Sequence, residues 1–177
     1  MPVFTMPTFT AGQPVLASDL ATLSSALNFS HNPPIAQLRQ DTSQSLGTSG
    51  TFAPITFDAE VVDSANGHST STNNSRYVAQ YAGWYEVSGG VAYVANTTGG
   101  RFAEIAVNGS AITGGSGVQA VTAAGTGTWV PVRTSKVFLN ANDYVEIWGM
   151  QNSGGALSTD TGTGAGKSSM TVQWVSN

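Results

Sequence analysis

The hydrophobic positions along this chain of 177 residues change their period near residue 40. Before that point, four leucines recur at intervals of three or four residues: Leu16, Leu20, Leu23 and Leu27. This spacing places them along one side of an α-helix. From Thr51 onward, short segments alternate apolar and polar residues, which is the period of β-strands. The pattern therefore predicts one short helix followed by a domain built of strands.

The predicted helix covers about residues 17–29. Ser18 is a suitable N-cap, and Asp19 lies in the first turn, where the helix dipole favours a negative charge. Pro33 and Pro34 prevent the helix from continuing past residue 32. A helix of this length is marginal alone in water, so its leucine stripe needs a surface to cover it. That surface belongs either to the chain's own domain or to a partner or sister subunit, and the sequence leaves both open.

The rest of the chain divides into a docking segment and a head. Residues 35–50 are mostly polar and end in a turn-rich sequence, so we expect a linker there. We place an extended arm, the helix and this linker in residues 1–45, and a head domain in residues 46–177. The strands expected in the head number about eight to ten, and Asn108-Gly109 marks a hairpin with a type I′ turn. This spacing predicts an all-β fold, either a β-sandwich or a jelly roll.

Several predicted strands carry large side chains on both faces, as where Trp84 stands beside Tyr85. A sandwich whose outer faces meet water would alternate apolar and polar residues more cleanly. We therefore expect part of the second face to be buried between copies of the chain. The candidates for core or intersubunit packing are Tyr85, Tyr93, Phe102, Trp148 and Trp174.

Composition excludes several classes of partner. Charged residues make up 9% of the chain, the net charge is −4, and the six Lys and Arg residues are scattered, whereas nucleic-acid binding requires clustered cations. No apolar run is long enough to span a bilayer, and the first residues lack the features of a secretory signal. The absence of cysteine excludes disulfides and thiolate metal sites. We expect a protein that is made in a cytoplasm and is stabilised by oligomerisation.

Candidate chemistry is sparse, and we predict neither an enzyme nor a cofactor. Asp58 and Glu60 share a strand face and are the only local pair of carboxylates. They could be paired catalytic acids or part of a calcium site, but the EF-hand spacing and its glycine are missing, which favours a solvated edge. A carbohydrate-binding module is the alternative. Such a module needs exposed aromatic residues that stack on sugar rings, and the glycine-rich loops contain only Trp129, at a margin.

Four stretches of the head resemble the C1q/TNF-like jelly roll, a family that forms compact homotrimers. They are FDAEVVDSANGHS (57–69), YAGWYEV (81–87), EIAVNGSAI (104–112), and the pair VFL (137–139) with NDYV (142–145), where Asn142 replaces the family's usual Gly. The resemblance extends from about Leu46 to Asn177. It implies a jelly-roll head and a homotrimer.

The N-terminal segment, FTAGQPVLASDLATLSSALNF with NPPIAQLRQ, is similar to the start of small virion proteins of actinobacterial tailed phages. These are minor tail proteins or capsid decoration proteins. The resemblance implies a homotrimeric virion surface protein that is made in the host bacterial cytoplasm. Residues 1–40, and their four leucines above all, would anchor it to capsid or tail proteins. The alternative is a lectin-like module that contacts a host-surface glycan.

Overall fold

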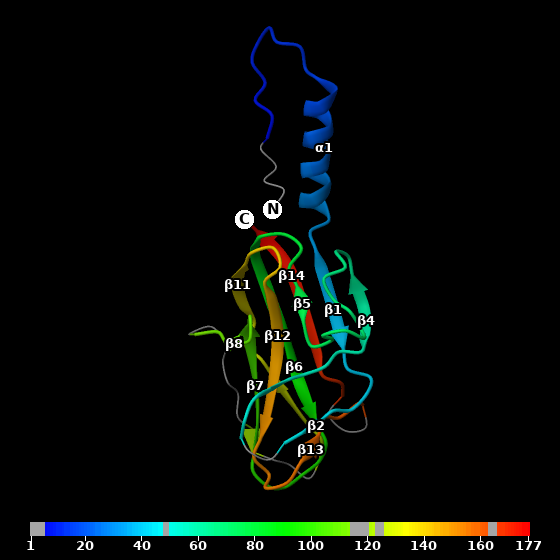
Figure 1. Cartoon of the computed structure of the whole chain (residues 1–177), viewed down its shortest axis with the longest axis vertical. Helices are drawn as coiled ribbons and strands as arrows, with labels where there is room; N and C mark the ends of the chain where they lie inside the picture. Colours follow the sequence, from blue (N-terminus) through cyan, green and yellow to red (C-terminus); the bar gives the residue numbers. More distant parts are fainter. Residues whose placement is uncertain (1–5, 48–49, 114–120, 123–125, 163–165) are drawn as a thin grey trace.

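Two antiparallel sheets form the body of the protein, and a helix stands at one end of it (Figure 1). The computed structural model describes residues 6–47, 50–113, 121–122, 126–162 and 166–177. All named strand pairs are antiparallel. The predicted all-β fold is therefore confirmed.

The first sheet runs in the order β10–β6–β14–β1–β4, with β11 also paired to β6. Its long central strand β6 pairs along one edge with β11 and then β10, and along the other with β14. Its strands are β1 (Ile35–Arg39), β4 (Ala59–Asp63), β6 (Gly83–Tyr93), β10 (Thr128–Pro131), β11 (Ser135–Leu139) and β14 (Ser169–Ser176).

The second sheet runs in the order β3–β12–β7–β8, with β5 also paired to β12 and β9 to β7. Its strands are β3 (Ala53–Pro54), β5 (Tyr77–Val78), β7 (Gly100–Val107), β8 (Ser110–Ala111), β9 (Val121–Thr122) and β12 (Tyr144–Gln151). A separate pair joins β2 (Ser45–Leu46) to β13 (Leu157–Ser158). The glycine-rich segment at residues 114–117 lies outside the described residues.

The core lies between the two sheets and follows the period-two pattern of the sequence. Along β6, the alternate residues Tyr85, Val87 and Val91 are fully buried. They meet Ile105 of β7 and Ile147 of β12 in one apolar cluster. Because successive side chains of a strand point to opposite faces, the same alternation leaves the other set of residues on the outer faces.

Residues 35–39 belong to the first sheet, so the interpretation of residues 35–50 as a polar linker is wrong for its first part. Strand β1 lies between β14 and β4. Ala36 and Leu38 are fully buried, whereas Gln37 and Arg39 are exposed on the outer face. Only two apolar residues face inward in this short strand, which is why its composition resembles that of a linker.

Two tight turns have the backbone that their residues predict. Asn108 and Gly109, between β7 and β8, both have positive φ, at 50° and 76°, as a type I′ turn requires. Asn142, in the turn before β12, has φ 74°. Asn tolerates this left-handed conformation better than other residues with a side chain, so it can replace the glycine expected there.

Candidate functional site: the docking helix and the apolar outer face

The leucine stripe of the helix is open to solvent in the described chain. Helix α1 (Ala17–His31) contains no buried residue, and it projects from the end of the sandwich (Figure 1). Leu16, Leu20 and Leu27 are 57%, 55% and 59% exposed, and Leu23 is half-buried. Of the two surfaces that could cover the stripe, the chain's own head does not do so.

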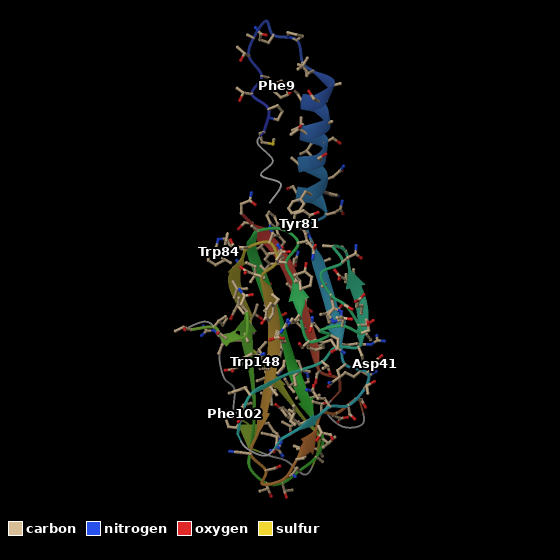
Figure 2. The ribbon with its side chains drawn as sticks, viewed as in Figure 1. Phe9, Asp41, Tyr81, Trp84, Phe102 and Trp148 are labelled. Carbon is tan, nitrogen blue, oxygen red and sulfur yellow. The ribbon has the colours of Figure 1, made fainter. Side chains whose placement is uncertain are left out.

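One aromatic contact attaches the helix to the head. The Phe29 ring meets the rings of Tyr81 and Trp174 edge to face, with centroids 5.0 and 4.8 Å away. Trp174 is itself held, because its indole nitrogen donates a hydrogen bond of 3.3 Å to the carbonyl of Ala82. Tyr81 lies at the junction between helix and sandwich (Figure 2). Trp174, predicted to pack in the core or between subunits, thus packs against the base of the helix.

The first turn of the helix differs from the prediction in its cap. The N-cap is Leu16, and the Asp19 carboxylate accepts a hydrogen bond of 3.1 Å from the Leu16 N–H. Ser18, predicted as the N-cap, lies inside the helix. The helix therefore starts two residues earlier than its best capping side chain would place it, while Asp19 still neutralises the positive end of the helix dipole.

Tyr85 and Tyr93 belong to the core of a single chain. Both are fully buried in β6. The Tyr85 hydroxyl donates to the carbonyl of Tyr81 at 2.6 Å. The Tyr93 hydroxyl donates across the sandwich to the carbonyls of Phe102 and Met150, at 2.6 and 3.1 Å. Burial raises the pKa of Tyr85 to about 12 and that of Tyr93 further, so both stay protonated donors at neutral pH.

Phe102 and Trp148 alternate with the buried residues Ala103 and Ile147, so they lie on the outer face of the second sheet. They occupy β7 and β12, and both are half-buried. The Trp148 indole nitrogen donates a hydrogen bond of 2.9 Å to the buried carboxylate of Glu146. Between them Glu104, only 7% exposed, has a pKa raised by burial. The Trp148 indole thus binds a carboxylate of its own sheet, and both aromatic rings leave part of their surface open.

The most exposed aromatic side chains of the head lie on the outer face of the first sheet. They are not among the five residues predicted to pack in the core or between subunits. Trp84 of β6 and Phe138 of β11 face each other across the strands, with ring centroids 5.6 Å apart, and are 42% and 47% exposed. Trp129 is 40% exposed and lies over Gly90 of β6, where a Cβ would come within 2.6 Å of its ring. Two sequence signals pointed to this face: Trp84 stands beside Tyr85 on the opposite strand face, and Trp129 lies at the margin of a glycine-rich loop. We call Trp84, Trp129 and Phe138 the aromatic face.

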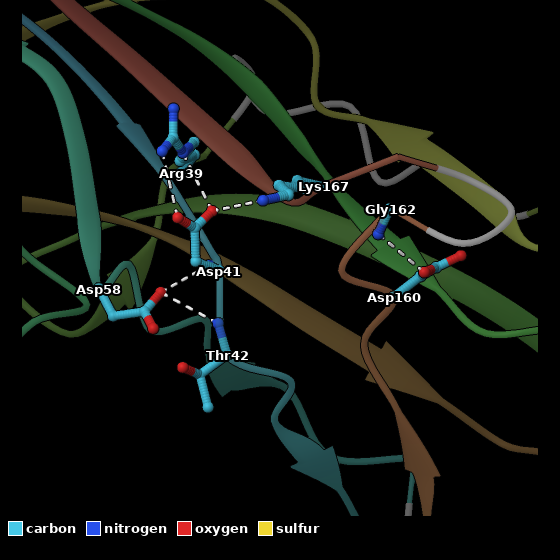
Figure 3. Close-up of polar contacts among 7 residues, drawn as sticks. All are labelled: Arg39, Asp41, Thr42, Asp58, Asp160, Gly162 and Lys167. Carbon is cyan, nitrogen blue, oxygen red and sulfur yellow. Dashed lines mark hydrogen bonds and ion pairs between the residues drawn. The ribbon is translucent and has the colours of Figure 1, made fainter.

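The predicted carboxylate pair serves to hold chain segments together. Asp58 accepts hydrogen bonds from the backbone N–H groups of Asp41 and Thr42, at 2.6 and 3.3 Å (Figure 3). Glu60 is 2.8 Å from the ring of His68. Each carboxylate therefore has its own structural partner.

A second polar contact lies beside these hydrogen bonds, next to the paired strands β1 and β14. Asp41 binds Arg39 at 3.0 Å and Lys167 at 2.7 Å (Figure 3). These two cations, with hydrogen bonds from both, lower the pKa of Asp41 to about 2. The carboxylate is thus ionised at any physiological pH and links β1 to the segment that leads into β14.

Among the described residues, no group of three or more His, Asp or Glu side chains could hold a metal ion. No helix in this part of the chain is long and apolar enough to cross a membrane. No model of a protein family matches this chain, and no curated protein matches it. The function is therefore argued from the geometry of the helix and of the aromatic face.

Proposed function

We propose that this protein is a structural and interaction protein of a tailed-phage virion, a homotrimer whose head is displayed and whose N-terminal segment docks on capsid or tail proteins. The resemblances of the head and of the N-terminal segment support this proposal. So does the division of the molecule into a compact sandwich and a projecting helix (Figure 1).

The exposed leucine stripe is the observation that carries the docking role. A 15-residue helix without any buried residue gains little stability from its own chain. It still exposes Leu16, Leu20 and Leu27 by more than half. Covering an apolar side chain of this size contributes about 1.5–3 kcal/mol, so a partner surface would stabilise the helix and hold the protein at once.

The aromatic face supports the homotrimer. Trp84, Trp129 and Phe138 lie on neighbouring strands of one sheet, and each is at least 40% exposed. Aromatic residues are enriched in the buried centres of protein interfaces. Contact between copies through this face would cover the aromatic rings. It would also stabilise a chain that has no cysteine and therefore no disulfides.

The double variant Leu20→Gln, Leu27→Gln tests the docking role in the full-length protein. Gln has nearly the helix propensity of Leu, so the helix itself is preserved. We expect the variant to fold and to keep its oligomeric state, but to be absent from purified virions when its incorporation is measured by quantitative mass spectrometry.

Val61→Gln is the matched control, because Val61 is 57% exposed but lies on strand β4 of the head. It should be incorporated as the wild type is. Normal incorporation of the helix variant would contradict the docking role.

A further inference from the structure

The head contains an open pocket of about 420 Å³ that the sequence did not reveal. One wall is the loop that joins β4 to β5, and the other is the turn and first residue of β12. This volume lies within the range of about 300–1,000 Å³ that is typical of small-ligand sites. Most of its lining residues carry polar side chains, among them Ser69, Thr72, Asn73, Arg76, Gln80 and Asn142, and Val78 and the Tyr144 ring add apolar surface.

Arg76 is held in a fixed position at the pocket. Its Nε donates to the Glu146 carboxylate at 3.2 Å, and its guanidinium lies over the Tyr144 ring, 4.0 Å from the ring centroid. Glu146 is only 4% exposed at its side chain and is also bound by the Ser75 hydroxyl at 2.7 Å. Neither terminal nitrogen of Arg76 forms a hydrogen bond to a described residue. The planar edge of the guanidinium is thus oriented and available.

The carboxylates nearest to the pocket are occupied. Glu146 is bound as described, and Glu60 contacts the His68 ring at 2.8 Å. Asp63 accepts hydrogen bonds from the backbone N–H groups of Ala65 and His68, at 3.3 and 2.8 Å. Arg76 is the only Lys or Arg side chain among the described residues that line this pocket. An anionic group is therefore the ligand group that Arg76 can recognise.

The remaining lining offers hydrogen bonds without charge. The side-chain amides of Asn73 and Asn142 and the Thr72 hydroxyl form no hydrogen bond to a described residue. The Gln80 amide nitrogen donates to the Val78 carbonyl at 3.2 Å, which leaves its oxygen free to accept. Amides and hydroxyls that both donate and accept are suited to a ligand with many hydroxyl groups.

We propose that this pocket binds a saccharide or polyol that carries a carboxylate or a phosphate group. The Arg76 edge receives the anionic group, and Asn73, Gln80 and Asn142 receive the hydroxyl groups. All these residues belong to one chain, so the site does not depend on the proposed docking helix or on the homotrimer.

Isothermal titration calorimetry of the full-length protein tests this site with three probes. They are a glucuronate-containing trisaccharide, its neutral glucose counterpart, and a glycerol-phosphate oligomer. We expect at least one anionic probe to bind about tenfold or more tightly than the neutral one, because a charge-assisted bidentate contact is lost with the anionic group. Binding of the trisaccharide alone identifies a carboxylated glycan, and binding of the oligomer alone identifies a phosphate-containing polyol.

Variants of Arg76 and Gln80 connect the binding to this pocket. Arg76→Lys keeps a positive charge for Glu146 but removes the planar edge, so we expect affinity to fall about tenfold. Gln80→Ala changes an exposed residue and should weaken binding severalfold without affecting the fold. Arg133→Gln removes the same charge from an exposed position elsewhere and should change nothing.

Three results would overturn the proposal. They are no binding of either anionic probe at millimolar concentration, equal binding of the neutral trisaccharide, and unchanged affinity in both pocket variants. If circular dichroism shows that Arg76→Lys does not fold, unchanged affinity in Gln80→Ala alone would overturn the proposal.

Discussion

Tyr93 connects the two sheets of the sandwich through one buried hydroxyl group. It stands on β6, and its two acceptors are the carbonyls of Phe102 on β7 and Met150 on β12. Phenylalanine would remove this hydroxyl and both of its hydrogen bonds, so the position favours tyrosine.

Tyr93→Phe is therefore expected to lower the free energy of unfolding by about 1–2 kcal/mol, as measured by urea denaturation at a fixed protein concentration. Tyr81→Phe is the control, because the Tyr81 hydroxyl forms no hydrogen bond to a described residue and the ring is retained. The control should stay within about 0.5 kcal/mol of the wild type. Equal destabilisation by the two substitutions would contradict the role of the Tyr93 hydroxyl.

At the scale of elements, the period of the sequence predicted most of what the structure contains. The helix, strand β6 and the Asn108-Gly109 hairpin follow from local patterns alone. Strand β1 was missed because its burial depends on β14, which lies about 130 residues further along the chain. Composition cannot show such pairing. The Phe29 contact escaped prediction for the same reason, since Tyr81 and Trp174 come from two distant segments.

Phe29→Ala tests whether this contact orders the helix. The substitution removes the ring that packs on Tyr81 and Trp174, so the helix would depend on its weak intrinsic stability. We expect the amides of α1 to lose protection in hydrogen exchange, while those of β6 and β14 keep it. Leu20→Ala, an exposed change on the same helix, should keep the protection of α1. Equal protection in the two variants would show that the contact is dispensable.

At the scale of the whole molecule, the apolar surface is unevenly distributed. The exposed leucines lie on the helix, and Trp84 lies at the same end of the head (Figure 2). The polar pocket of Arg76 is formed by the loop between β4 and β5 and by β12. The candidate site was thus predictable in its helical part, where the signal is local. The aromatic face and the pocket required the strand pairing, because their residues are distant in sequence.

The mass of the purified full-length protein in solution tests the homotrimer most directly. Native mass spectrometry at micromolar concentration should give a species of three chains of 18.2 kDa each, about 55 kDa in total. The double variant Trp84→Ser, Phe138→Ser, which removes two rings of the aromatic face, should shift the protein towards the single chain. A wild-type protein that is found only at 18.2 kDa would contradict the account.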